Sequence, residues 1–347
     1  MNFVVSIEHP AWAHQFRSII KTLEQRGHKV KVFAVKKDMD LELLDKFGIK
    51  YEKVADSTGN NIIEKAWLLF IITVRIFFKS LSFKPDIFIG RASPMMALNS
   101  FFFGKPHIIF EDTDHSHISL FFCKLFSALI ITPVSFRTDL GKKQKKFPVY
   151  KELFYLHPSS FTPDESILTE LGVNKGECFT VMRFVSWKAD HDMGQKGLSN
   201  KNKLAAVKEF EKFGKVFITS EEPLKNDLEP YRIQIAAEKM HHVLYFASLL
   251  YGESSTMASE CAVLGTHAIF CDFAGRGYTD EQEKRFDLVY NFKLDEQSQK
   301  DSIHKGIELL SDPLLWQKGK EKRKKLLNEM RDGTELFLEQ LDLYMNK

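Results

Sequence analysis

The chain has 347 residues, of which 44% are hydrophobic and 27% charged, so we expect a globular protein of about two domains and exclude disorder and fibrous repeats. Its 49 basic and 46 acidic residues leave a net charge of +3, which argues against a surface built for nucleic acid. Any anion must then be bound locally.

The amino terminus and the cysteines indicate a reducing compartment. No basic segment precedes an apolar stretch at residues 1–6, so we expect no secretion signal and a cytoplasmic protein. The four cysteines lie in or beside apolar runs at spacings that match no metal site, and we favour reduced core residues over a redox or metal role. They are Cys123, Cys178, Cys261 and Cys271.

Short runs of β-branched and aromatic residues alternate with helical patterns along the chain, which predicts strand–helix–strand units in parallel sheets. The first helix has Phe16, Ile19 and Leu23 on one face and should end at Gly27. In the first half we expect strands at residues 3–7, 30–35, 86–89, 107–110 and 129–132. In the second half we expect them at residues 178–184, 215–219, 243–246, 267–270 and 288–291.

These two series of strands predict two Rossmann-like domains that meet near residues 155–162, where turn residues precede a new helix. We place the first domain at residues 1–160, the second at 161–315 and a helical tail at 316–347. The tail should break near Asp332 and cross back to the first domain. The basic cluster at residues 142–146 is interpreted as a solvated loop, with a site for anionic lipid or acceptor phosphate as the alternative.

An apolar helix is expected at residues 62–83, which include Trp67, Phe70, Phe77 and Phe78. Its apolar core, interrupted by Arg75, is too short to span a membrane. We favour burial against a sheet. The alternative is contact with a membrane surface that bears a lipid-linked acceptor.

The turn at residues 252–256, with the sequence GESST, precedes a predicted helix that ends at Gly265. Glycine allows close backbone approach, and the amides at a helix start are donors for anions, so a diphosphate would fit there. Glu260 lies one turn beyond Thr256 on the same face, within reach of sugar hydroxyls. The alternative is a plain helix cap with a glutamate like that of a capping box.

Residues 252–270 resemble the donor-binding segment of GT-B enzymes such as the N-acetylglucosaminyltransferase of peptidoglycan assembly and the non-hydrolysing nucleotide-sugar 2-epimerases. The resemblance implies an α/β fold of two Rossmann-like domains with parallel sheets facing across a cleft. It also implies a nucleotide diphosphate sugar as donor substrate and no required cofactor. The residues implied for the diphosphate are Gly252, Ser254, Ser255 and Thr256, and the residue implied for the ribose is Glu260. Glu253 departs from the pattern, because a carboxylate beside a diphosphate is unfavourable unless it points away or meets a metal ion.

Over nearly its whole length the chain also resembles a microbial family known only as domain of unknown function 354. The matching motifs are residues 7–10 with His14, 110–115, 150–153, 183–187, 191–192, 196–198 and the turn at 252–256. Because that family has no settled reaction, this resemblance implies the fold and the donor class more than the chemistry.

The loop at residues 8–14 follows the first strand, at the carboxyl end where ligands of open α/β sheets bind. In the peptidoglycan enzyme the matching loop carries a histidine beside the reacting centre, and a histidine can take the proton of an acceptor hydroxyl near neutral pH. We favour His14 as the base, His9 as the second choice and Glu8 as an acceptor contact. The alternative is that both histidines cap the helix and fill the loop.

Three carboxylates and two histidines lie within residues 111–117, after another predicted strand. Their spacing fits acceptor binding, a general base, a divalent ion or a solvated loop. Because GT-B enzymes generally need no metal ion, we favour the acceptor site and assign no metal ligand. This gives a catalytic role to Asp112 and acceptor binding to Glu111, Asp114 and His115.

The second domain supplies further candidates around the turn at residues 252–256. Arg183 ends the first strand of that domain and is predicted to neutralise the departing diphosphate, with a salt-bridged strand end as the alternative. Weaker donor candidates lie in the loop beyond it and in the helix that starts near residue 275, where GT-B relatives touch the donor sugar. They are Ser186, Lys196, Thr279, Glu281 and Gln282.

The leading hypothesis is an inverting or retaining glycosyltransferase of cell-surface glycan biosynthesis, which moves a sugar from a nucleotide diphosphate to a hydroxyl of a glycan or lipid-linked acceptor. One alternative is a nucleotide-sugar epimerase or hydrolase, which needs no such acceptor. Another is a non-catalytic nucleotide-sugar-binding protein. We expect no nucleic acid partner. Peripheral contact with the inner face of the membrane is compatible with each of these hypotheses.

Overall fold

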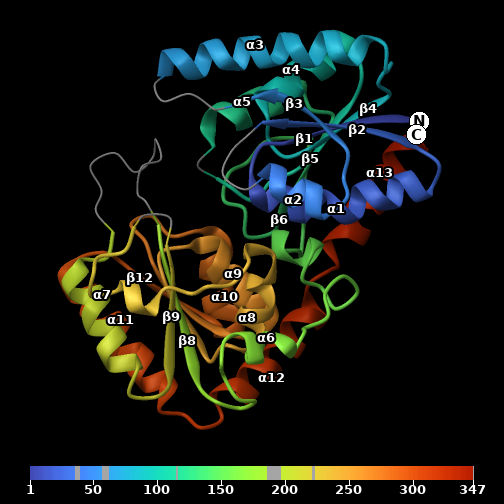
Figure 1. Ribbon diagram of the computed structural model, residues 1–347. Helices are drawn as coiled ribbons and strands as arrows, with labels where there is room; N and C mark the ends of the chain where they lie inside the picture. The colour runs from blue at the N-terminus through green and yellow to red at the C-terminus, as the bar shows by residue number, and fades with distance from the viewer. Residues whose placement is uncertain (36–39, 57–61, 115, 186–196, 221–222, 347) are drawn as a thin grey trace. The chain divides into compact units, whose positions relative to one another are not determined.

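The computed structural model describes residues 1–35, 40–56, 62–114, 116–185, 197–220 and 223–346 (Figure 1). The chain divides into two compact units: unit 1 comprises Met1–Ser160 with Met330–Lys347, and unit 2 comprises Phe161–Glu329. Each unit contains one sheet, and every strand pair among the described residues is parallel. The predicted α/β class with two Rossmann-like units is confirmed.

Unit 1 is built on a seven-stranded sheet in the order β3-β2-β1-β4-β5-β6-β7. Its strands are β1 (Asn2–Ile7), β2 (Lys29–Val35), β3 (Tyr51–Ala55), β4 (Ile87–Gly90), β5 (His107–Phe110), β6 (Leu129–Pro133) and β7 (Gln144–Phe147). Its helices are α1 (Pro10–Gln25), α2 (Asp40–Lys46), α3 (Ile62–Leu81), α4 (Pro94–Phe103), α5 (His117–Phe126), the 3-10 helix η1 (Lys151–Phe154) and α13 (Gly333–Met345). In Figure 1, α3, α4 and α5 cover one face of this sheet, and α1, α2 and α13 cover the other.

The apolar pattern explains the centre of unit 1. The strands β1, β4 and β5 are buried along nearly their whole length, as expected for parallel strands with helices on both faces. The helix α1 begins with Pro10 and buries Phe16, Ile19 and Leu23, and the chain then turns at Gly27 with a φ of +79°. All four cysteines are free, and only Cys178 is partly exposed.

Two strands at the edges of this sheet, β3 and β7, were not predicted. Residues 144–146 of the basic cluster belong to β7, so its interpretation as a loop is wrong for them, whereas Lys142, Lys145 and Lys146 are exposed, as expected for solvated side chains. Both strands carry charged side chains, as edge strands often do, and such a composition hides the β pattern. In β7 the ammonium of Lys146 donates to the carbonyl oxygen of Phe136 at 2.6 Å.

The predicted apolar helix is α3, and its two sides differ in exposure. Ile72 and Ile76 are buried against the sheet, as expected. On the other side Trp67, Phe70 and Phe78 are 61%, 57% and 65% exposed, so the preference for burial is wrong for that side.

Unit 2 is built on a five-stranded sheet in the order β12-β11-β10-β8-β9. Its strands are β8 (Phe179–Phe184), β9 (Lys215–Ser220), β10 (Leu249–Gly252), β11 (His267–Cys271) and β12 (Val289–Phe292). Its helices are α6 (Ser166–Glu170), α7 (Asn200–Phe210), α8 (Met240–Phe246), α9 (Ser255–Leu264), α10 (Gly277–Phe286), α11 (Glu296–Leu310) and α12 (Leu315–Glu329), with the 3-10 helices η3 (Glu229–Tyr231) and η4 (Ala237–Lys239). One apolar cluster joins α7 and α11 to the sheet, and α8, α10 and α12 each contact α9.

The strand predicted at residues 243–246 is wrong, because these residues form the end of α8. A short run of β-branched and aromatic residues does not distinguish a strand from a buried helix. The strand that leads to the turn at residues 252–256 is β10, which starts at Leu249.

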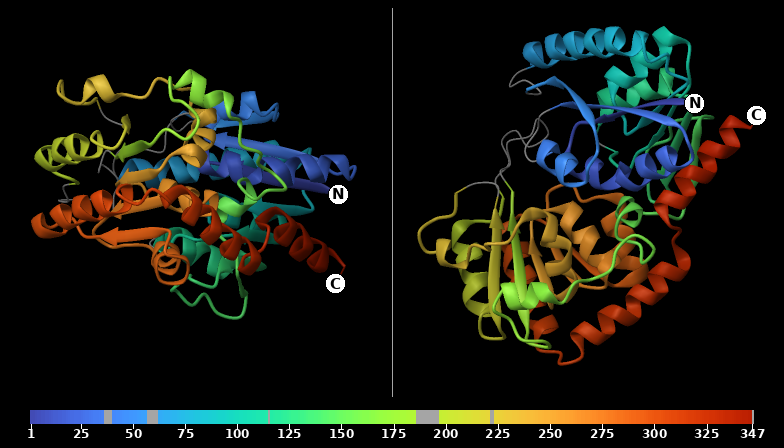
Figure 2. Two further views of the ribbon diagram at one scale, coloured as in Figure 1. Left: turned by 90° about the horizontal axis from the view of Figure 1, so that it is seen from below. Right: turned by 45° about the vertical axis from the view of Figure 1, so that its right-hand side comes forward.

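The helical tail returns to unit 1 as α13, drawn red in Figure 2. After the break between α12 and α13, Asp332 is the N-cap of α13. Its carboxylate accepts hydrogen bonds from the amides of Thr334 and Glu335 at 2.8 and 3.0 Å. Phe337 then packs edge-on against Phe16 of α1, with the ring centroids 5.8 Å apart. The expected crossing of the tail to the first unit is confirmed.

Candidate functional site

The turn after β10 begins at Gly252, whose backbone has a φ of +156°. Gly252 pairs with Arg183 of β8, and a Cβ atom at position 252 would lie 2.0 Å from the carbonyl oxygen of Arg183. Any other residue would clash with the neighbouring strand. The sheet itself therefore accounts for this glycine, with or without a ligand.

The amino terminus of α9 is capped by Ser254, whose hydroxyl oxygen accepts a hydrogen bond from the amide of Met257 at 3.3 Å. The capping interpretation is therefore correct for Ser254. The helix starts at Ser255, and the first amides of a helix have no carbonyl partner within it. Residues 254–256 are partly exposed, so a phosphate group could reach the amides of Ser255 and Thr256.

Glu253 is turned away from those amides and is 4% exposed. One carboxylate oxygen accepts a hydrogen bond from the amide of Val185 at 3.0 Å, and the other accepts one from the amide of Leu198 at 2.5 Å. The ammonium of Lys203 lies 3.6 Å from the same carboxylate. The carboxylate is thus held within unit 2 by two backbone amides and lies close to the ammonium of Lys203.

Glu260, predicted for the ribose, lies in α9 and is 7% exposed. Its carboxylate contacts Nε2 of His241 in α8 at 3.0 Å. His241 was not among the predicted site residues, because residues 243–246, next to it in the chain, were predicted as a strand. The available signal was the pair of neighbouring histidines at 241 and 242.

Three predicted sugar contacts lie in α10, which follows β11. Thr279 is fully buried, and its hydroxyl donates to the carbonyl oxygen of Arg276 at 3.0 Å. Gln282 is fully buried too, and its amide donates to Oγ of Ser259 in α9 at 2.8 Å. Glu281 forms an ion pair within α10 at 2.5 Å, and its side chain is 12% exposed. All three side chains therefore take part in contacts within unit 2, and their role toward a sugar stays a prediction.

Arg183 lies at the carboxyl edge of the same sheet. Its guanidinium donates to the hydroxyl of Thr219 on β9 at 3.0 Å, and its carbonyl oxygen accepts from the amide of Glu253 at 2.9 Å. The predicted role in neutralising a leaving diphosphate is not tested by these contacts. The candidates Ser186 and Lys196, and in unit 1 His115, lie outside the described residues.

In unit 1 the loop after β1 leads directly into α1. His9 is the N-cap of this helix, and its Nδ1 accepts from the amide of Ala11 at 3.2 Å. His14 lies in the second turn, where its ring centroid is 5.2 Å from that of Phe47 and 5.4 Å from that of Tyr155. Glu8 accepts a hydrogen bond from the hydroxyl of Ser6 at 2.9 Å. Capping is thus confirmed for His9, and the role of either histidine as a base stays a prediction.

A buried charge cluster lies at the carboxyl ends of β4 and β5, and its centre is Arg91. This arginine is 4% exposed and forms ion pairs with both Glu111 and Asp112. Glu111 also accepts a hydrogen bond from the amide of Ala92 at 3.0 Å. The ammonium of Lys151 in η1 lies 3.5 Å from the carboxylate of Asp112.

The charges of this cluster hold one another in the ionised form. Burial alone would raise the pKa of Asp112, but Arg91 and Lys151 outweigh burial and lower this pKa to about 2. Burial opposes the charge of Arg91 as well, yet the two carboxylates raise the pKa of the guanidinium above its ordinary value. A general base works best with a pKa near the working pH, so these properties favour a structural role for Asp112.

Arg91 was not among the predicted site residues. Its signal in the sequence was an arginine directly after the apolar run Ile87–Gly90, since an arginine at a buried position needs a partner. Asp114 has a local role, because its carboxylate accepts from the amides of Arg137 and Thr138 at 2.9 and 3.0 Å.

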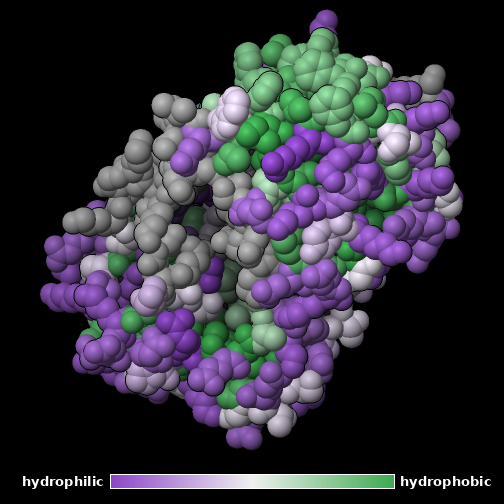
Figure 3. Space-filling view, turned by 45° about the horizontal axis from the view of Figure 1, so that its top comes forward, coloured by the Kyte–Doolittle hydropathy of each residue, from purple (hydrophilic) through white to green (hydrophobic). Residues whose placement is uncertain are grey.

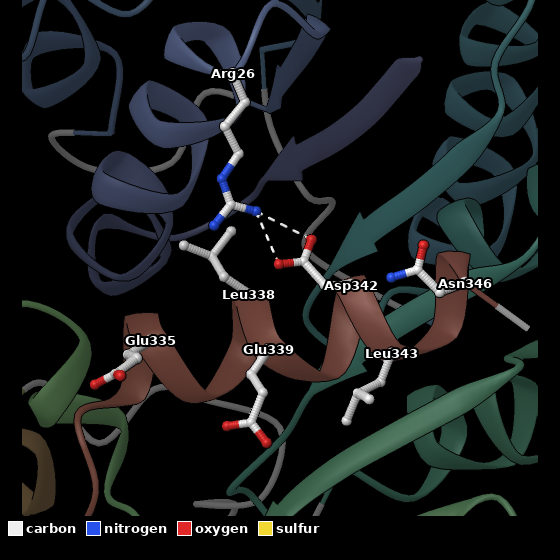
Figure 4. A pocket seen from close by; sticks show the side chains of 7 residues that line it. All are labelled: Arg26, Glu335, Leu338, Glu339, Asp342, Leu343 and Asn346. Atoms are coloured by element: carbon white, nitrogen blue, oxygen red, sulfur yellow. Dashed lines mark hydrogen bonds and ion pairs between the residues drawn. The ribbon is translucent and has the colours of Figure 1, made fainter.

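A hollow of about 340 Å³ lies between α1 and α13 (Figure 4). Arg26 reaches across it to the carboxylate of Asp342 at 3.0 Å. Because Arg26 precedes β2, this hollow lies toward the amino ends of the strands, away from the candidate residues of unit 1. Its lining residues are Arg26, Glu335, Leu338, Glu339, Asp342, Leu343 and Asn346.

Two units, each with a parallel sheet covered by helices on both faces, define a fold of the GT-B type, and solved structures of that type match nearly the whole chain. A putative UDP-N-acetylglucosamine 2-epimerase from Listeria monocytogenes has a TM-score of 0.70 at 12% identity, over 99% of this chain and 96% of its own. UDP-GlcNAc 2-epimerase from Neisseria meningitidis, bound to UDP-GlcNAc, has a TM-score of 0.72 at 12% identity, over 98% and 99%. The glycosyltransferase VinC in complex with dTDP has a TM-score of 0.67 at 10% identity, over 100% of both chains.

At these identities the similarity shows the fold. Neither a protein-family model nor a curated protein sequence matches the chain. The expected membership of domain family 354 therefore has no support from these comparisons.

Proposed function

We propose that this protein is a glycosyltransferase that moves a sugar from a nucleotide diphosphate to a hydroxyl acceptor in cell-surface glycan biosynthesis. The observation that carries the proposal is the start of α9. There the partly exposed turn at residues 254–256 offers backbone amides, while the carboxylate of Glu253 is bound elsewhere. Structures of the same fold with UDP, UDP-GlcNAc or dTDP support this ligand class.

In the proposed reaction the acceptor oxygen forms a bond to the anomeric carbon, and the bond from that carbon to the diphosphate oxygen breaks. His14 takes the acceptor proton, with His9 as the second candidate. Arg183 and the amides of Ser255 and Thr256 stabilise the negative charge that collects on the leaving diphosphate. Glu260, oriented by His241 at 3.0 Å, accepts hydrogen bonds from the ribose.

Nucleotide-sugar epimerisation is the second candidate. Both UDP-GlcNAc 2-epimerases and glycosyltransferases are among the solved structures with this fold, which keeps this reaction as a candidate. An epimerase would use the same donor turn without a second substrate. Acceptor dependence of turnover therefore separates the two reactions.

The donor turn is tested by thermal shift with a panel of nucleoside diphosphate sugars, because a ligand that binds only the folded state raises its stability. We expect at least one sugar nucleotide to raise the melting temperature and Ser255→Trp to abolish the shift. Glu296→Trp is the matched control, since Glu296 is the first residue of another helix of unit 2, and it should keep the shift. No shift with any donor would overturn the proposal.

The reaction is then identified from the products that the bound donor gives. Release of nucleoside diphosphate only in the presence of an acceptor supports glycosyl transfer. Formation of an epimer without acceptor identifies an epimerase, and release of free sugar without acceptor identifies a hydrolase. Tight donor binding with no product under any condition identifies a non-catalytic binding protein.

A further inference from the structure

The helix α3 is apolar on two sides, of which the sheet covers only one. Its outer side repeats apolar residues at helical spacing, with Trp67, Phe70, Val74, Phe78 and Leu81 in one stripe. Leu81 is 47% exposed, and the three aromatic residues of the stripe are 57–65% exposed. A surface helix normally places polar residues on its outer side, so this second stripe needs a partner.

The neighbouring helices extend this apolar stripe. At the end of α4, Phe101 and Phe102 are 59% and 57% exposed. In α5, Ile118, Phe121 and Leu125 are 71%, 60% and 51% exposed, and their spacing of three and four residues places them on one side of the helix. Three consecutive helices thus turn apolar side chains outward.

Ring contacts show that the exposed residues form one continuous surface. Phe77 contacts Phe78 on α3 and Phe102 on α4, with centroid distances of 5.7 and 6.2 Å. Phe101 of α4 lies 4.9 Å from Phe126 of α5. Figure 3 shows the result as a broad green area in its upper part. We call the exposed residues of α3, α4 and α5 the apolar face of unit 1.

The apolar face is larger than a monomer in water normally exposes. With six aromatic side chains each about 60% exposed, it presents on the order of 700 Å² of aromatic surface alone. The largest apolar patch of a typical monomer is about 300–600 Å² and often functional.

Charge at this face favours an anionic partner. Of the basic residues in α3, α4 and α5 whose side chains are described, Arg75, Lys79 and Lys124 are exposed, and the exposed acidic residue is Glu64. Lys79 forms an ion pair with Glu52 of β3 at 2.8 Å, and Arg75, which donates to the carbonyl oxygen of Val54 at 2.7 Å, keeps its charge. Lys105, directly after α4, is also exposed. A symmetric contact with a second copy would bring the same basic surface against itself. Anionic phospholipid headgroups complement it, and aromatic side chains with a basic rim are typical of elements that lie in the membrane interface.

We propose that the apolar face of unit 1 docks on an anionic phospholipid bilayer, with α3 lying along the surface. None of the helices in the described part of the chain is both long enough and apolar enough to cross a bilayer. The side chains of the apolar face enter the acyl boundary, and the lysines stay at the headgroups. This docking does not depend on the proposed reaction, although it would bring unit 1 to a lipid-linked acceptor.

The test is flotation of the full chain with vesicles. We expect it to float with mixed phosphatidylcholine and phosphatidylglycerol, and to float less in high salt, which screens the lysines. Phe78→Glu with Phe121→Glu should lower the partition coefficient by roughly tenfold or more. The matched control is Leu314→Glu with Leu343→Glu, at two other exposed apolar residues, and it should float like the wild type.

A second measurement locates the contact without disturbing the fold. Brominated acyl chains quench tryptophan fluorescence, so vesicles that contain them should quench the wild-type protein, and Trp67→Phe should lose most of that quenching while still floating. The proposal is overturned if the wild type does not float, if both double variants float equally, or if pure phosphatidylcholine binds as well as the anionic mixture. It is also overturned if light scattering shows a dimer that Phe78→Glu dissociates and no vesicle binding.

Discussion

The carboxylate of Glu253 accepts a hydrogen bond from the backbone amide of Leu198 at 2.5 Å, and its other oxygen accepts one from the amide of Val185. These two amides lie on either side of the chain segment that carries Ser186 and Lys196. Glu253, the residue that departs from the small-residue pattern of donor turns, therefore connects Val185 and Leu198. Two of the donor candidates lie between these two residues in the sequence.

Replacing Glu253 by alanine should release both amides. Leaving a buried amide without an acceptor costs about 1–3 kcal/mol, so we expect a less stable unit 2 and faster hydrogen exchange at Val185 and Leu198. Hydrogen exchange followed by mass spectrometry or NMR measures this. Glu229→Ala, which removes an exposed ion pair, is the control and should leave both amides unchanged. Unaltered exchange at Leu198 in Glu253→Ala would show that the carboxylate does not hold this amide in solution.

The cluster around Arg91 should be far more sensitive than a surface ion pair. Arg91→Met leaves Glu111 and Asp112 buried without their main counter-ion, which we expect to lower the unfolding free energy by about 3–5 kcal/mol. Arg26→Met removes a pair with Asp342 whose side chains are both 40% exposed, and should change it by about 0–1 kcal/mol. Urea unfolding of both variants gives the comparison. Equal losses would mean that the cluster is not sealed from water.

Acid should destabilise the protein through Asp112 and Asp332. Burial would raise both pKa values, but cationic and hydrogen-bonding partners lower each to about 2, below the ordinary value of 3.8. The unfolded state therefore binds protons first as the pH falls, and the stability that these groups supply above pH 4 is lost between pH 4 and pH 2. Asp112 contributes on the order of 2 kcal/mol, and the half-buried Asp332 contributes less because solvent screens its partners. Unfolding followed across this range should give a shallower pH dependence for Asp332→Asn than for the wild type.

Gly252→Ala should destabilise unit 2 because its Cβ would meet the carbonyl oxygen of Arg183 at 2.0 Å. Overpacking of this kind costs about 1–3 kcal/mol, in addition to the strain of the positive φ. Gly176 also has a positive φ, of +83°, but a Cβ atom there would have no neighbour within 4 Å, so Gly176→Ala isolates the strain alone. Thermal unfolding should rank Gly252→Ala below Gly176→Ala, and the reverse order would contradict the close approach of β10 to β8.

The sequence predicted the buried centre of each sheet better than its edges. The strand at residues 107–110 was predicted with its observed bounds, because an apolar run between helical patterns is a strong signal for a buried parallel strand. In β3, Glu52 and Lys53 interrupt the apolar pattern, and β7 carries two lysines. Each pairs with the strand that precedes it in the chain, β2 or β6, so it is the charged side chains and not a distant partner that hide these strands from the sequence pattern.

For the candidate site, the sequence predicted which turn or helix a residue belongs to better than it predicted which side chains that residue contacts. The order of glycine, serine cap and helix at residues 252–264 follows from local rules, and the structure has it. The contact of Glu260 with His241 could be predicted only if α8 was assigned as a helix. The contact of Glu253 with the amide of Leu198 could be predicted only from the position of Leu198 in the fold. Likewise, no sequence pattern around Arg91 indicates that Lys151 contacts Asp112, the carboxylate with which Arg91 is paired.

The return of α13 to unit 1 has a consequence for biosynthesis. Unit 1 is encoded in two pieces, and the second piece leaves the ribosome only after all of unit 2. Until then Phe16 and Phe154 lack the ring of Phe337, which lies 5.8 and 6.4 Å from theirs in the finished fold. Apolar side chains in the amino-terminal part of unit 1 therefore stay exposed until α13 has been synthesised. We expect nascent chains of this protein to bind chaperones for longer than nascent chains whose domains are completed one after the other.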